Sequence, residues 1–233
     1  MTLLTVSDLT IGFDLQPLIE NISFSVPRGR CVCLTGPSGC GKTTLLKTIA
    51  GLRRPDHGRI DTHGIHPAFV FQEPRLLPWC TVRENIALAA PAAAGVNEAI
   101  DHWLDRMHLT AADAAKYPDE LSGGMSQRVA MARALMLSAD LIVMDEPFSA
   151  LDAHLRRELQ LLTRDLVTRE HISVLLVTHD KMEALRMADT VLRLNGSPAR
   201  LTEQLELPSC AGLRSDTDAS AYFSHPVFAA GER

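Results

Sequence analysis

The chain has few lysines, few aromatic residues and no long apolar run. Lysine occurs only at Lys42, Lys47, Lys116 and Lys181, aromatic residues make up 5% of the chain, and the formal net charge is −5. Such a charge provides no general basic field, so we expect no nucleic-acid partner. No apolar run approaches the roughly 18 residues of a membrane helix, and the first residues lack the basic start of a signal peptide. We therefore expect a soluble, intracellular chain.

Cysteine is also sparse, and its spacing excludes two kinds of site. The five cysteines are Cys31, Cys33, Cys40, Cys80 and Cys210. They form no C-x-x-C pair, and no histidine joins them at zinc spacing. Because free cysteine is usually buried, we expect reduced thiols without a metal.

Apolar runs and helical patterns alternate along the 233 residues, which predicts an α/β fold. The first third is β-like, with a helix expected at 42–50 and a hairpin or short strands at 58–72. An alanine-rich helical insert is expected at about 75–139. Strands and helices then alternate to residue 196, which favours a parallel sheet covered by helices. From about residue 208 the sequence is polar and aperiodic, so we expect a loosely packed tail.

The stretch "GPSGCGKT", residues 36–43, follows an apolar run and precedes a helical pattern. It matches G-x-x-x-x-G-K-[ST], a loop that wraps phosphate with backbone N–H groups at a helix N-terminus. Glycine permits the close approach and the positive φ that such a loop needs. The residues expected to contact phosphate are Gly36, Pro37, Ser38, Gly39, Cys40, Gly41, Lys42, Thr43 and Thr44.

Lysine at this position is informative because arginine dominates the other basic positions. Lys42 offers a compact charge on a flexible stem, which reaches between two phosphates where a planar guanidinium would be too wide. Thr43 offers a hydroxyl to Mg²⁺. The alternative is a glycine-rich turn with an incidental lysine.

Polar residues end three other β-like runs. Asp145 and Glu146 follow "LIVM", His179 follows "ISVLLVT", and Gln72 follows "FVF". The carboxyl ends of strands are where open α/β sheets bind ligands. Asp145 and Gln72 are candidate Mg²⁺ ligands, Glu146 is the candidate base for the attacking water, and His179 is a candidate γ-phosphate contact. Each also has a structural alternative, as a helix cap or as a satisfied polar side chain.

A second helix N-terminus lies in "LSGGMSQRVAMARALML". Ser122 is a good N-cap, and Gly123 and Gly124 expose the first amides of the helix, which makes it a second anion site. If each chain binds one nucleotide, this site serves the nucleotide of another chain. A plain capped helix is the alternative.

Together these motifs resemble those of the ATP-binding cassette ATPases over residues of about 3–205. The matching segments are the 36–44 loop (Walker A), Gln72 (Q-loop), "LSGGM" (signature), "LIVMDE" (Walker B), "SALD" at 149–152 with Asp152 (D-loop), and His179 (switch histidine). Phe13 falls where that family stacks an aromatic ring on adenine. The resemblance implies ATP and Mg²⁺ as cofactors and catalytic roles for Lys42, Glu146 and His179.

The resemblance also implies an architecture and partners. We expect one ATPase domain over 1–207, with an N-terminal antiparallel β-subdomain and an inserted helical subdomain, and a tail at 208–233 without a regulatory domain. A head-to-tail homodimer would hold ATP between the loop of one subunit and Ser122 and Gly124 of the other. Closure around a shared γ-phosphate is the differential binding that a ligand switch requires.

A finer resemblance lies in "FQEPRLLPWCTVRENIALA", residues 71–89, which is similar to importer ATPases for nitrate, sulfonate, taurine or thiamine precursors. It implies an integral membrane permease that docks at about 72–85, with Trp79 as a candidate anchor, and an extracytoplasmic solute-binding protein. The chain would be peripheral, at the cytoplasmic face of the inner membrane. Leu76, Leu77 and Trp79 could instead be ordinary core residues.

Two other functions use similar motifs. A mechanical regulator would use the same ATP sandwich to signal across a membrane without transport. A small-molecule kinase would share the phosphate loop but leave "LSGGM" and "SALD" unexplained.

Overall fold

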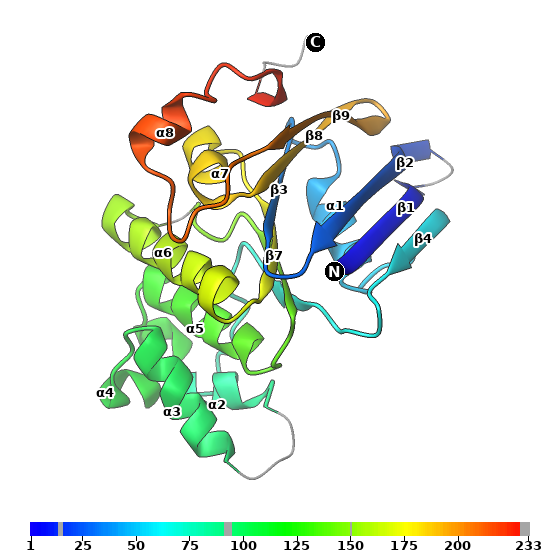
Figure 1. Ribbon diagram of the computed structural model, residues 1–233. Coiled ribbons are helices and arrows are strands. Elements are labelled where there is room, and N and C mark those ends of the chain that lie inside the picture. The colour runs from blue at the N-terminus through cyan, green and yellow to red at the C-terminus, as the bar shows by residue number, and fades with distance from the viewer. Residues whose placement is uncertain (14–15, 91–94, 150, 229–233) are drawn as a thin grey trace.

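The computed structural model describes residues 1–13, 16–90, 95–149 and 151–228 (Figure 1). Its strands are β1 (Thr2–Phe13), β2 (Gln16–Pro27), β3 (Cys31–Thr35), β4 (His57–Asp61), β5 (Ala68–Val70), β6 (Leu141–Asp145), β7 (Ser173–Val177), β8 (Thr190–Gly196) and β9 (Ala199–Glu206). Within the described ranges these nine strands form one sheet, in the order β4-β1-β2-β9-β8-β3-β7-β6-β5.

The sheet has a parallel part and an antiparallel part. Strands β8, β3, β7, β6 and β5 pair in parallel, and every residue of β3, β6 and β7 is buried, as in strands covered on both faces. At the other edge β4, β1 and β2 pair antiparallel. The predicted α/β fold with an antiparallel N-terminal part is therefore confirmed, and one pairing between β2 and β9 makes the sheet continuous.

Helices cover both faces of the parallel part. They are α1 (Lys42–Ile49), α2 (Val82–Ala87), α3 (Val96–Arg106), α4 (Ala111–Ala114), α5 (Gly123–Leu135), α6 (Ala153–Arg169), α7 (Lys181–Met187) and α8 (Asp216–Ser220), with 3₁₀ turns η1 (Pro118–Glu120) and η2 (Pro226–Phe228). Helices α2 to α5 gather at one end of the molecule, away from β9 (Figure 1). None of the described helices is long and apolar enough to span a membrane.

Alternate residues of each central strand feed two separate apolar cores. Val143 and Leu175 pack with Leu45 of α1 in one core, whereas Ile142 and Leu176 pack in the other core, which also contains α5 and α6 residues. This follows from the period of two along a strand. The arrangement buries β3, β6 and β7 and leaves their carboxyl ends to carry polar side chains.

Two parts of the fold differ from the sequence expectation or were not predicted. Of the two alternatives for 58–72, the hairpin is wrong, because β4 and β5 lie at opposite edges of the sheet. Strand β9 was not predicted. It follows β8 after a turn at Ser197 and Pro198 and pairs antiparallel with it.

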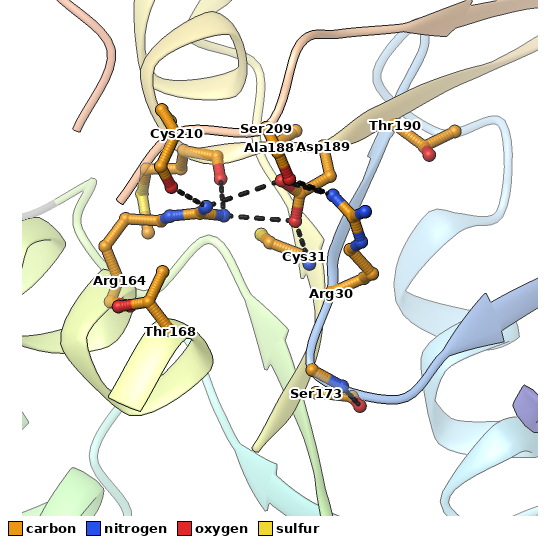
Figure 2. A network of polar contacts seen from close by, with 12 residues as sticks. Arg30, Cys31, Arg164, Thr168, Ser173, Ala188, Asp189, Thr190, Ser209 and Cys210 are labelled. Atoms are coloured by element: carbon orange, nitrogen blue, oxygen red, sulfur yellow. Dashed lines mark hydrogen bonds and ion pairs between the residues drawn. The ribbon is translucent and has the colours of Figure 1, made fainter. Parts of the chain in front are cut away.

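The tail is packed, not loose as expected. Val227 and Phe228 are buried, so apolar contacts hold its end. Arg214 is also buried, and its guanidinium donates to the carbonyl of Pro208 at 2.6 Å and to that of Ala188 at 3.3 Å. Arg164 of α6 donates to the Cys210 carbonyl (Figure 2). A few arginines satisfy the irregular backbone, which a periodicity argument does not detect.

Candidate nucleotide site

The loop between β3 and α1 encloses the lysine ammonium group. Lys42 Nζ donates to the carbonyls of Gly36 and Pro37, both at 2.8 Å, and lies 4.0 Å from Cys40 Sγ. The side chain is only 7% exposed. Its charge is therefore held inside the loop at the N-terminus of α1, where phosphate oxygens would add further acceptors.

Two glycines of this loop are required by their surroundings. Gly36 has φ 148°, and a Cβ there would lie 2.4 Å from the carbonyl oxygen of Leu194. Gly41 has φ 102°, and its Cβ would lie 2.9 Å from Ile19 Cγ1. A side chain at either position would push the loop away from β8 or β2. The glycines thus serve loop packing as well as phosphate approach.

Asp145 ends β6 as a buried carboxyl beside the loop. Burial raises its pKa, whereas a hydrogen bond from Thr43 and the nearby Lys47 charge lower it. Among the described residues no group of three or more His, Cys, Asp or Glu could hold a metal. A hydroxyl and one carboxylate do fit Mg²⁺, which takes few protein ligands and relies on phosphate oxygens and water.

Three predicted residues from three strand ends meet at one carboxylate. Glu146 Oε2 lies 3.2 Å from His179 Nδ1 and accepts from Gln72 Nε2 at 3.4 Å. Glu146 has φ 46°, a left-handed conformation that is costly for a residue other than glycine. Its N–H donates to the Val177 carbonyl at 3.0 Å, which fixes this conformation against β7. The His179 side chain is 65% exposed, unlike a satisfied core histidine.

The second predicted anion site is an N-terminus that also serves packing. Ser122 Oγ accepts from the Met125 N–H at 3.3 Å, as an N-cap does. A Cβ on Gly124 would lie 1.9 Å from Leu155 Cδ2, so this glycine lets α5 approach α6, whereas Gly123 faces open space. No hydrogen bond recorded for the described residues joins 122–124 to the 36–44 loop.

Phe13 and Asp152 have structural partners. The Phe13 ring is 52% exposed, and the Arg53 guanidinium lies 4.0 Å from its centroid. Asp152 caps α6 by accepting from the N–H groups of His154 and Leu155, both at 3.0 Å. The Leu155 hydrogen bond is the main cause of its lowered pKa. Ala150, within the predicted "SALD" motif, lies outside the described residues.

Sequence reasoning missed several polar residues near Glu146. Arg156, Thr178 and Glu183 line a small cavity with Glu146 and His179. No motif marks Arg156 or Glu183. The only signal is that Glu183 lies four residues before Met187, so the two share a face of α7, and Met187 is a core residue.

A lysine-centred loop at a helix N-terminus, beside an acidic strand end in a parallel sheet, defines a phosphate-binding nucleoside triphosphatase of the P-loop class. The profile of the ABC transporter family matches residues 19–149, and the chain belongs to that family. It is therefore an ABC-type ATPase, a subunit that binds and hydrolyses ATP.

Similar curated proteins are import subunits. The chain is 42% identical over 199 residues to the aliphatic sulfonates import ATP-binding protein SsuB 2 of Burkholderia cenocepacia, covering 82% of this chain and 73% of that protein. It is 43% identical to SsuB 1 of Pseudomonas savastanoi, covering 89% and 85%. It is 42% identical to the nitrate import ATP-binding protein NrtD of Synechococcus elongatus, covering 82% and 74%.

A solved cassette has the same fold. The dimeric ATP-binding cassette MJ0796, in a post-hydrolysis state bound to ADP and Pi, matches with a TM-score of 0.79 and 26% identity. The match covers 89% of this chain and 100% of that chain.

Proposed function

We propose that this chain is the ATP-hydrolysing subunit of an importer for a small solute, which resembles nitrate, a sulfonate or taurine, or a thiamine precursor. The similarity to import ATP-binding proteins, at 41–43% identity, supports the transport assignment. The meeting of Gln72 and His179 at Glu146 Oε2 supports the hydrolytic assignment and carries the proposal.

Each predicted site residue has a role in this proposal. Lys42 and the amides of the 36–44 loop bind the phosphates. Thr43, Asp145 and Gln72 would hold Mg²⁺, which, when bound, neutralises phosphate charge. Glu146 orients and deprotonates the attacking water, and His179 maintains the geometry between that water and the γ-phosphate. Phe13 contacts adenine.

One chain would bind its own ATP through the 36–44 loop. Its Ser122, Gly123 and Gly124 would then contact the ATP that a second copy of the chain holds. In the proposed homodimer these residues and Asp152 approach the nucleotide held by the partner's loop. The dimeric state of the similar solved cassette supports this arrangement. Ser122→Arg should therefore spare ATP binding by a monomer but prevent ATP-dependent dimerisation, measured by sedimentation. Dimerisation equal to that of the unchanged chain would contradict it.

An exposed apolar surface supports docking of a permease. Trp79 is 72% exposed, so the core-packing alternative for this residue is wrong. Leu77, two residues before it in the chain, lines a groove of about 250 Å³ together with Leu88 and Leu137. An aromatic anchor beside an apolar groove is typical of an interface hot spot. The chain would then be peripheral, at the cytoplasmic face of the inner membrane, with a solute-binding protein on the other side.

Affinity purification of the Glu146→Gln chain from its native membrane with ATP and Mg²⁺ tests this proposal. We expect a polytopic permease, and ligand screening of its cognate solute-binding protein would then name the solute. Lys42→Ala, which should not bind ATP, is the matched control. Recovery of a membrane protein with a large extracytoplasmic domain and no binding protein would favour a mechanical regulator. A soluble chain that phosphorylates a metabolite would overturn the transport assignment.

A further inference from the structure

A cluster of buried and partly exposed polar side chains lies beside the candidate catalytic residues, where α6 meets α7. We call it the α6–α7 junction, and its residues are Arg156, Gln160, Thr178, Asp180 and Glu183. It borders a cavity of about 40 Å³, whose lining also includes Glu146 and His179. The junction is therefore placed to affect the residues that act on the attacking water.

Glu183 joins three parts of this junction. Its side chain is 4% exposed. Gln160 Nε2 of α6 donates to Glu183 Oε2 at 3.3 Å, and the Thr178 hydroxyl, directly after β7, lies close enough to the carboxyl to lower its pKa. Thr178 Oγ1 in turn accepts from the Asp180 N–H at 3.0 Å. A chain of contacts thus runs from the Glu183 carboxyl to the two residues that flank His179.

Arg156 supplies the positive charge of the junction without contacting Glu183 directly. Its Nη1 lies 3.7 Å from Asp180 Oδ2, and its Nη2 donates to the Leu151 carbonyl at 3.0 Å. Arg156 Nε is buried and has no hydrogen-bond partner among the residues that the structure describes. Because Arg156 and Gln160 are four residues apart, they share a face of α6. The end of the 149–152 segment is thereby linked to the start of α7.

Burial raises the pKa of Glu183 to about 7. The groups that face it are Arg156 and Gln160 from α6, Thr178 and Asp180 from the turn before α7, and Cys31 and Cys33 from β3. Asp180 raises the pKa further, and the Arg156 charge and the Thr178 and Gln160 hydrogen bonds lower it. Burial also raises the pKa of both thiols, so they are neutral at physiological pH.

We propose that Glu183 is a positioning residue for ATP hydrolysis, which holds the turn Thr178–Asp180, and with it His179, beside Glu146 when its carboxyl is uncharged. An uncharged carboxyl still accepts from Gln160 Nε2 and does not repel Asp180. An ionised one repels Asp180 and attracts Arg156 away from it. Ionisation therefore loosens the turn that carries His179. This inference rests on the proposed function.

The first test is the pH profile of ATP turnover by full-length protein. With increasing pH above about 7, we expect kcat of the unchanged chain to fall about threefold or more while KM changes little. Glu183→Gln, a neutral isostere, should keep kcat within about twofold over the same range. Glu158→Gln, an exposed α6 residue paired with His154, is the matched control and should follow the unchanged chain. An unaltered alkaline decline in Glu183→Gln would overturn the proposal.

A second test monitors the conformation of the Thr178–Asp180 turn by NMR and needs no ATP hydrolysis. Its result is therefore independent of the proposed function. In isotopically labelled protein, the Gln160 side-chain amide reports ionisation of Glu183, and the Asp180 backbone amide reports the turn. Both NMR signals should titrate with one midpoint near 7, and Glu183→Gln should remove that component from both. Thr178→Val should leave the Gln160 titration but uncouple Asp180. A Gln160 titration that Asp180 does not follow in the unchanged chain would refute the positioning role. Absence of ATP turnover would count against the proposed function alone.

Discussion

Two groups of charged side chains at α6, one with a direct ion pair and one without, differ in how they accommodate a buried ionisable residue. In the first (Figure 2), the Arg164 guanidinium donates to the two carboxylate oxygens of Asp189, at 3.1 and 3.4 Å. Asp189 also accepts from the Cys31 N–H at 2.8 Å, and Arg164 donates further to the carbonyls of Met187 and Cys210. The buried cation of Arg164 thus pairs directly with the buried anion of Asp189, and most hydrogen-bond donors and acceptors of the two side chains have partners.

In the second group, the α6–α7 junction, no ion pair joins Glu183 to another described side chain. The neutral Gln160 side chain donates to its carboxyl, and Arg156 lies against Asp180 instead. The pKa values differ accordingly. Burial alone would lower the pKa of Arg164, but Asp189 raises it, whereas burial prevails at Glu183. Direct pairing keeps a buried charge fixed, and incomplete pairing leaves a group that changes charge near neutral pH.

The largest expected effect comes from breaking the paired group. Arg164→Met removes the buried cation of Asp189 and leaves only the half-exposed Arg30, 3.4 Å from its Oδ1, so it should lower the free energy of unfolding by about 3 kcal/mol. Urea unfolding followed by circular dichroism measures this. A loss below about 1 kcal/mol would mean that the group is not held by its ion pair.

A substitution in the α6–α7 junction should change the free energy of unfolding in the opposite direction, because Glu183→Gln should raise it above pH 7. The folded chain keeps the Glu183 proton to a pH near 7, whereas the unfolded chain releases it near 4.5. The folded state therefore binds more protons between these values, and the free energy of unfolding falls as pH rises through this window. Glu183→Gln should remove that fall and be more stable above pH 7 by up to roughly 3 kcal/mol. Parallel pH curves for both chains would contradict the raised pKa.

Residues that act through local backbone chemistry could be predicted from the sequence. The strand, glycine loop and helix around Lys42, the Ser122 cap and the polar strand ends at Asp145, Glu146 and His179 all lie in contiguous patterns. The sheet type followed from the same alternation. These features depend on neighbours within a few residues, so spacing alone predicts them.

Features that depend on distant partners could not be predicted. The left-handed Glu146 is fixed by the Val177 carbonyl, and the tail by arginine donors from other elements. Glu183 meets Gln160 across a separation of 23 residues. Residues so far apart in the chain leave no repeating pattern in the sequence from which their contact could be predicted. The only available sign was that Glu183 lies four residues before the core residue Met187, on the same face of α7.

A smaller effect should follow from removing the positive charge of the junction. Arg156→Met should lose about 1 kcal/mol, because one hydrogen bond to a carbonyl disappears from a partly exposed side chain. Since the Arg156 charge lowers the pKa of Glu183, its removal should also shift the Gln160 NMR titration to higher pH. A downward shift would show that another group sets the charge of Glu183.

The smallest effect should come from an exposed ion pair of good geometry. Arg28 Nη1 lies 2.8 Å from Asp140 Oδ1, closer than the shortest Arg164–Asp189 contact, but both side chains are 42% exposed. Water and salt screen such a pair, so Arg28→Met should cost between 0 and about 1 kcal/mol, and less still at high salt. Urea unfolding under the conditions used for Arg164→Met gives a direct comparison. If the two substitutions cost the same, contact distance rather than burial would decide what an ion pair contributes in this fold.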